Sequence, residues 1–209
     1  MSIQHHLELE RFVLQRLPDL TGKHVLDLGC GKELLGYLCR QSKGGDTAWI
    51  VGADIWIPYL DFCSRFGAYD YLVQIDGKDQ LPFHEGWFDV VLACEVLHHL
   101  PRTAGDQLLD ELEPLARECL ILTCPNGNQL RGPVDSVPVE AHVFVWHTRD
   151  FRSRGYEVRV LGFRFQPGNG RLALALWYAA TPLATRLPRL ADCLIAYRST
   201  DPSFRQAFA

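Results

Sequence analysis

The sequence has no pair of cysteines in a CxxC arrangement, although seven cysteines are spread along its 209 residues. An odd number of cysteines without close pairs argues against a disulfide framework or a structural zinc site, and it favours reduced thiols. No apolar run reaches the roughly 18 residues that a membrane-spanning helix requires. The best candidate, residues 172–184, is shorter and contains Pro182. The first twelve residues, MSIQHHLELERF, lack the charged-then-apolar pattern of a signal peptide. We therefore expect a cytoplasmic protein.

Neither sign of charge dominates, because 21 lysines and arginines face 25 acidic residues and leave a net charge of −4. This balance gives no overall electrostatic footprint for a nucleic-acid backbone and no polybasic membrane patch. The apolar share of 47% is enough for a substantial core. We expect one soluble domain over residues 1–209, without a nucleic-acid partner or a membrane span.

Short apolar runs alternate with helical patterns through the first 125 residues. Strands are expected at residues 25–28, 48–53, 71–75, 88–93 and 119–123. Helices are expected at residues 4–16 (within an N-terminal helical segment, residues 1–20), 33–41, 58–65 and 103–116. This alternation predicts an α/β fold, a doubly wound parallel sheet with helices on both faces.

The last third follows another pattern. Residues 156–162 and 171–177 alternate like two strands around a QPGNG turn, so we expect an antiparallel hairpin at the sheet edge. A closing helix is expected at residues 180–197, within a C-terminal helical extension over residues 178–209. The apolar residues in this region are expected to pack on the sheet. The alternative is a surface for a homodimer partner, a carrier protein or a lipid-like acceptor.

Four acidic residues stand at or just past the ends of successive expected strands. They are Asp27, Asp54, Asp76 and Glu95. Because ligands bind beyond the carboxyl ends of parallel strands, these four side chains predict one shared crevice. The alternative for each acid is a capping or turn role.

A pair of glycines in HVLDLGCGKELLG follows the first expected strand, and three kinds of nucleotide loop begin in this way. A triphosphate-binding loop is excluded, because Tyr37 stands where its lysine should follow Gly36. A dinucleotide fingerprint fits Gly29 and Gly31, but its third glycine is replaced by Leu34. A loop for a nucleoside without phosphate is the third possibility.

Three stretches, VLDLGCG, VGADI and QIDGKDQLPFHEGWFDVVLACEVLHHL, resemble the class I (Rossmann-like) S-adenosylmethionine-dependent methyltransferases of the type 11 methyltransferase domain. The resemblance runs from about residue 24 to residue 127. It implies a mostly parallel seven-stranded sheet and S-adenosyl-L-methionine as the cofactor. One departure is Glu33, which occupies the position where the family often has a third glycine.

The resemblance also implies a role for each matching residue. Gly29, Cys30 and Gly31 would let the backbone approach the cofactor, and Asp27 would lie near its amino group, directly or through water. Asp54 would bind the ribose hydroxyls, with Ile55 against the adenine. The remaining matches, expected at the adenine edge and beneath the sulfonium, are Asp76, Gly77, Cys94 and Glu95.

Methyl transfer requires an aligned acceptor and, for a hydroxyl, removal of its proton. The loop over residues 125–150 follows the fifth strand and is expected on the acceptor side. It contains His142 and His147, and His98 lies shortly before the helix expected at residues 103–116. Each of the three histidines is a candidate general base. Packing and helix-end roles are the alternatives. No metal is expected, because the adjacent His98 and His99 would point in different directions on a helix.

The sequence thus predicts a methyltransferase acting on a small molecule. Two alternatives remain: a methyltransferase for tRNA or protein, and a cofactor-binding module without turnover, for which Glu33 is the supporting feature. A nicotinamide oxidoreductase is a more distant alternative.

Overall fold

The computed structural model describes residues 12–32, 34–127, 130, 132–133, 138–162, 175, 179, 183, 186–187 and 190–200. Of the helix expected at residues 4–16, residues 12–14 are helical and residues 15–16 form a turn. Residues 4–11 lie outside the described part of the chain. Glu33 also lies outside the described residues. So does the expected strand over residues 171–177, except for residue 175.

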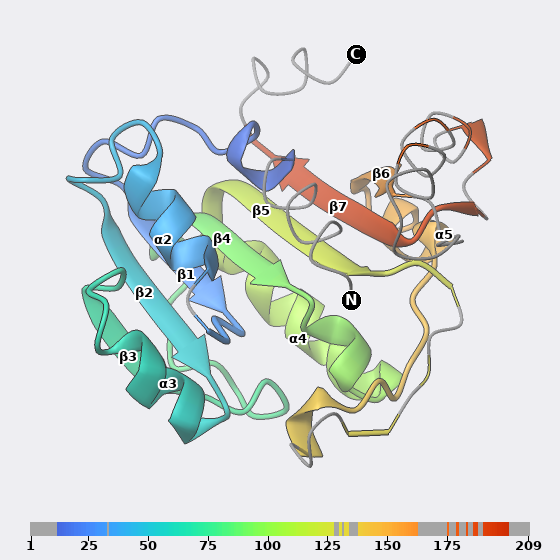
Figure 1. Cartoon of the computed structure of the whole chain (residues 1–209), viewed down its shortest axis with the longest axis horizontal. Helices are drawn as coiled ribbons and strands as arrows, with labels where there is room; N and C mark the ends of the chain where they lie inside the picture. Colours follow the sequence, from blue (N-terminus) through green and yellow to red (C-terminus); the bar gives the residue numbers. More distant parts are fainter. Residues whose placement is uncertain are drawn as a thin grey trace.

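One sheet of seven strands, in the order β3-β2-β1-β4-β5-β7-β6, runs through the described part of the chain (Figure 1). The strands are β1 (His24–Leu28), β2 (Trp49–Asp54), β3 (Tyr71–Gln74), β4 (Phe88–Cys94), β5 (Ala116–Pro125), β6 (Glu157–Leu161) and β7 (Cys193–Ser199). The first five strands pair in parallel, and β7 pairs antiparallel with both β5 and β6. The predicted doubly wound, mostly parallel fold with antiparallel edge strands is confirmed.

Helices connect the parallel strands. They are α2 (Leu34–Gln41), α3 (Ile57–Cys63), α4 (Arg102–Leu115), α5 (Thr148–Arg152) and two 3-10 turns, η1 (Leu97–His99) and η2 (Pro138–Glu140). Pro58 lies in the first turn of α3, where its missing N–H costs no helical hydrogen bond. The expected helices at 33–41, 58–65 and 103–116 are confirmed to within two residues at each end.

Two hydrophobic cores lie on opposite faces of the sheet. Alternate residues of β4 divide between them, with Val91 and Ala93 on one face and Val90 and Leu92 on the other. Helices α4 and α5 cover the first face, whereas α2 and the segment 12–20 cover the second. Burial of a leucine or valine side chain contributes about 1.5–3 kcal/mol. Both faces of the strands are therefore apolar, and the polar ligand site is left to the strand ends.

The end of the chain differs from the prediction. Residues 193–199, expected as the last part of a closing helix and of a C-terminal helical extension, form strand β7. Because β7 lies between β5 and β6, its side chains are buried on both faces and show no polar alternation. Such a run cannot be distinguished from a buried helix by periodicity. Strand β6 pairs with β7, and the expected partner of residues 156–162, residues 171–177, lies outside the described residues except for residue 175.

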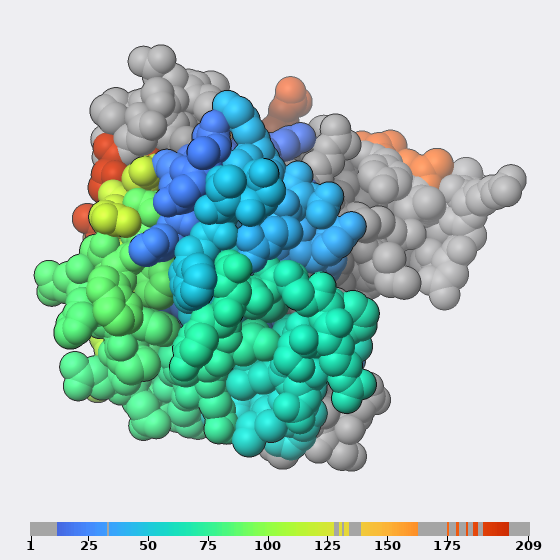
Figure 2. Space-filling view, turned by 90° about the vertical axis from the view of Figure 1, so that its left-hand side faces the viewer, coloured from blue at the N-terminus to red at the C-terminus, as the bar shows by residue number. Residues whose placement is uncertain are grey.

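Seen from the β3 edge, most of the surface is formed by the first half of the chain, in blue to green (Figure 2). Helices α2 and α3 lie at this end of the sheet (Figure 1). Among the described residues, no helix combines the length and apolar character that crossing a bilayer would need.

Candidate functional site

A cavity of about 610 Å³ opens at the carboxyl edge of β1, β2 and β4, as expected for a parallel sheet. Ten residues were expected to contact the cofactor, and eight of them line this cavity. These eight are Gly29, Gly31, Asp54, Ile55, Asp76, Gly77, Cys94 and Glu95. The other two, Asp27 and Cys30, are buried behind its wall. Three of the four strand-end acids, Asp54, Asp76 and Glu95, therefore share one cavity, and Asp27 does not line it.

A tight turn after β1 forms one wall. Gly29 has a φ of +76°, and a Cβ placed there would lie 2.3 Å from Cγ2 of Val96. The N–H groups of Gly29 and Cys30 both donate to the carbonyl of Ala53 in β2, at 2.7 and 3.0 Å. Only glycine combines this left-handed conformation with such close packing. The turn therefore presents bare backbone to the cavity.

Asp54, the last residue of β2, ties this turn to α3. One carboxylate oxygen accepts the N–H of Gly31 at 2.9 Å, and the other accepts the N–H of Trp56 at 2.8 Å. Burial raises the pKa of Asp54, while these backbone hydrogen bonds act in the opposite direction. Each oxygen retains a lone pair after accepting one hydrogen bond. The carboxylate can therefore bind a hydroxyl donor from the cavity.

The segment after β3 forms the next part of the wall. Its backbone is attached to β2 by the N–H of Ile75, which donates to the carbonyl of Asp54 at 3.1 Å. The Asp76 side chain accepts the N–H of Lys78 at 3.0 Å and closes a short turn around Gly77. Such an Asx turn fixes the direction of the Asp76 carboxylate.

Glu95 follows β4 directly and is the one non-glycine residue with positive φ in the described part of the chain, at +60°. Its N–H donates to the carbonyl of Thr123 at 2.9 Å, and its carboxylate accepts the Thr123 hydroxyl at 3.1 Å. Burial raises the pKa of Glu95 to about 7. A non-glycine residue in this conformation costs about 1–3 kcal/mol, and such strain concentrates at functional sites.

Asp27, expected near the amino group of the cofactor directly or through water, does not line the cavity. Its side chain is fully buried, and one oxygen accepts the hydroxyl of Tyr69 at 2.7 Å. The other oxygen, Oδ1, has no hydrogen-bond partner among the described residues. Burial raises the pKa of Asp27 to about 7. Tyr69 in turn accepts the N–H of Gly36 at 3.2 Å, so Asp27 supports α2 from behind the turn.

The three predicted general bases lie in two places. His98 and His142 are buried behind the cavity, and His147 is exposed at the start of α5, where its N–H donates to Asp150 at 2.8 Å. The neighbouring His99 does line the cavity. Of the three candidates, none belongs to the cavity wall.

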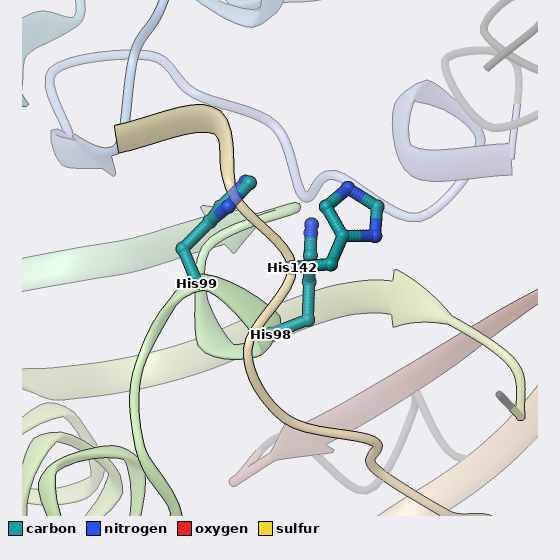
Figure 3. A group of neighbouring side chains, drawn as sticks. All are labelled: His98, His99 and His142. Atoms are coloured by element: carbon teal, nitrogen blue, oxygen red, sulfur yellow. The ribbon is translucent and has the colours of Figure 1, made fainter. Parts of the chain in front are cut away.

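The expectation that His98 and His99 diverge is wrong. Their ring centroids are 4.0 Å apart, and His142 lies 4.1 Å from His98 and 5.2 Å from His99. The expectation assumed a continuing helix, whereas Leu97–His99 is a single 3-10 turn that passes into extended backbone at Leu100. The third histidine comes from a separate segment that crosses this turn (Figure 3).

Tyr59 and Glu140 belong to no sequence motif. Together they close one side of the cavity. The Tyr59 hydroxyl in α3 donates to the Glu140 carboxylate at 2.6 Å, and both residues line the cavity. This contact connects α3 with η2. Tyr59 and Glu140 are far apart in sequence, so only the path of the loop could have revealed the pair.

A methyltransferase domain model matches residues 26–128, which run from within β1 to just beyond β5. The ubiquinone biosynthesis O-methyltransferase of Escherichia coli O139:H28 (strain E24377A / ETEC) is 27% identical over 122 residues, or 56% of this chain and 45% of that protein. The chain thus covers less than half the length of this curated relative.

Two solved structures share the fold. Magnesium protoporphyrin IX methyltransferase from Synechocystis PCC 6803 aligns with a TM-score of 0.60 and 16% identity, covering 94% of this chain and 84% of that chain. A methyltransferase dependent on S-adenosylmethionine from Archaeoglobus fulgidus aligns with a TM-score of 0.58 and 18% identity, covering 95% and 100%.

The matching domain, the sheet order and the glycine turn with its strand-end acids agree with one another. Residues 26–128 form a methyltransferase domain, and the sheet has the fold of the class I S-adenosylmethionine-dependent methyltransferases.

Proposed function

We propose that this protein transfers a methyl group from S-adenosylmethionine to a small-molecule acceptor. The observation that carries the proposal is the cavity in which the glycine turn meets the carboxylates that follow β2, β3 and β4. The methyltransferase domain supports the cofactor. The names of two similar proteins, a ubiquinone biosynthesis O-methyltransferase and a magnesium protoporphyrin IX methyltransferase, support an acceptor of small size.

The glycine turn fits an adenosyl ligand without phosphate groups. A side chain at Gly29 would collide with Val96, so the turn leaves a cradle of bare backbone. Asp54 and Glu95 line the same cavity and would repel a pyrophosphate when ionised. The same carboxylates attract the sulfonium and ammonium charges of S-adenosylmethionine.

The wall residues divide into an adenosyl side and a reacting side. We assign Asp54 to the ribose hydroxyls, Ile55 and Gly77 to the adenine ring, and Asp76 to its exocyclic amine. Gly31, Cys94 and Glu95 would border the methionine portion. Asp27 is enclosed behind the turn and is assigned a positioning role through Tyr69. Cys30 contributes its backbone N–H to the turn.

When bound, the cofactor supplies an electrophilic methyl carbon, so the reaction is an in-line displacement at that carbon. The residues of this chain orient the acceptor and exclude water. The acceptor side is formed by Tyr59, His99, Glu140 and Val143. The hydrogen bond between Tyr59 and Glu140 holds the segment around η2 across the cavity.

The test is methyl transfer from S-adenosylmethionine that carries a labelled methyl group. Phenols, carboxylic acids and amines would be offered in parallel with bulk tRNA and unfolded protein. Label in a small acceptor, and loss of transfer in Asp54→Ala, is the expected result. Label in tRNA or protein would establish the macromolecular alternative instead. Tight cofactor binding without transfer to any acceptor would indicate a silent cofactor-binding module.

A further inference from the structure

The three histidines beside the cavity support an inference beyond methyl transfer. One ring nitrogen from each of His98, His99 and His142 can be chosen so that all three atoms lie within 4.8 Å of one another. The three side chains extend to the same side of their two backbone segments (Figure 3). We propose that His98, His99 and His142 bind a divalent transition-metal ion at the acceptor side of the cavity.

The spacing of the three nitrogen atoms suits a metal ion. A zinc–nitrogen bond measures about 2.0–2.1 Å, so two nitrogens on one tetrahedral ion are about 3.4 Å apart. Closing the present spacing to this value needs a shift of about an ångström, which small side-chain rotations provide. Aromatic packing by itself would not require nitrogen atoms to converge.

His99 is held in a tautomer that can bind a metal. Its Nδ1 lies 2.8 Å from the carbonyl of Ala141. Because a carbonyl only accepts, Nδ1 carries a proton, and in the neutral ring Nε2 keeps its lone pair. Metal-binding histidines characteristically donate their second N–H in this way, which fixes the ring and raises its basicity.

Hydrogen bonds fix the segment that contains His142 against the turn η1. The N–H groups of Val143 and Phe144 donate to the carbonyl of His98 at 2.9 and 3.2 Å. The buried indole of Trp146 donates to the carbonyl of Leu97 at 3.0 Å. These bonds attach the segment that contains His142 to η1. A preorganised frame of this kind is what a set of metal ligands requires.

The imidazole ligands indicate which ions the site would bind, and its position beside the cavity indicates what a bound ion would do. Imidazole nitrogens favour zinc, iron, nickel or copper ions, whereas magnesium and calcium prefer oxygen ligands. Three protein ligands leave at least one position open, as in catalytic rather than structural zinc sites. His99 and Ala141 line the cavity, so this position is accessible from the acceptor side. This use rests on the proposed function: an ion here would bind an oxygen-bearing acceptor and lower the pKa of its hydroxyl.

The test uses Co²⁺ as a spectroscopic probe, with Zn²⁺ competing for the same site. The full-length protein is stripped with a chelator and titrated. The expected result is one equivalent of bound Co²⁺, visible ligand-field bands without sulfur-to-metal charge transfer, and displacement by one equivalent of Zn²⁺. His142→Ala should weaken Co²⁺ binding by about 100-fold or more. His84→Ala, which removes an exposed histidine elsewhere, is the matched control and should leave Co²⁺ binding unchanged.

Equal Co²⁺ affinity in the wild type and in His142→Ala would overturn the proposal, as would a charge-transfer band from cysteine ligands. If His142→Ala does not fold, the partly exposed His99→Gln decides the question by the same measurement. Binding of S-adenosylhomocysteine is measured in parallel by calorimetry. Cofactor binding without Co²⁺ binding refutes the metal site alone, whereas Co²⁺ binding without cofactor binding or methyl transfer refutes only the proposed function.

Discussion

Replacement of Asp54 by alanine should weaken cofactor binding strongly. Its carboxylate accepts the N–H groups of Gly31 and Trp56 at 2.9 and 2.8 Å, and it lines the cavity where the ribose hydroxyls would lie. Loss of one hydrogen bond to a charged group costs about 1.5–3 kcal/mol, which corresponds to a loss of about 10- to 150-fold in affinity. Isothermal titration calorimetry with S-adenosylhomocysteine would measure this loss.

The control for this variant is Asp70→Ala. Asp70 also holds β2, because its carboxylate accepts the N–H of Ile50 at 2.7 Å and pairs with Arg40 at 2.8 Å. It does not line the cavity. Asp70→Ala should therefore lower the free energy of unfolding and leave the cofactor affinity within about twofold. If folded Asp54→Ala bound the ligand as tightly as the wild type, the assignment of Asp54 to the ribose would be refuted.

Three further predictions concern residues in the wall of the cavity or directly behind it. Gly29→Ala should lower the free energy of unfolding by about 1–3 kcal/mol more than Gly67→Ala, because both residues have positive φ but only Gly29 faces a collision with Val96; equal losses in urea unfolding would contradict the close packing. Burial raises the pKa of Asp27 to about 7 in the folded state, above its ordinary value of 3.8. As pH rises, the unfolded state therefore loses this proton before the folded state does. The free energy of unfolding should thus fall between about pH 4 and pH 7, and Asp27→Asn should flatten that fall; superimposable pH curves would argue against it. Glu95→Gly should be about 1 kcal/mol more stable than Glu95→Ala, since glycine relieves the strain at φ +60°, while both variants lose methyl transfer; equal melting temperatures would exclude the strain.

The strands that form the cofactor side could be predicted from the sequence because each is a short apolar run that ends at a polar residue. Asp54, Asp76 and Glu95 follow from this pattern, since the carboxyl ends of parallel strands share one edge. Strand β7 could not be identified in the same way. It is buried between two neighbours, so its residues show neither the alternation of an exposed strand nor helical periodicity.

The side chains at the acceptor side depend on long-range geometry. The contact between Tyr59 and Glu140 and the approach of His142 to His98 both require the path of the segment after β5, which no local pattern specifies. The position of Asp27 relative to the cavity was also beyond the sequence. A residue within a strand faces one side of the sheet, and which neighbour encloses it depends on how Tyr69 packs.

The cavity should accept an adenosyl ligand that carries no phosphate. Isothermal titration calorimetry of the purified protein with S-adenosylhomocysteine and, separately, with NAD⁺ tests this expectation most directly. We expect one-to-one binding of S-adenosylhomocysteine and no measurable binding of NAD⁺. Saturable binding of NAD⁺ with no heat from S-adenosylhomocysteine would contradict it.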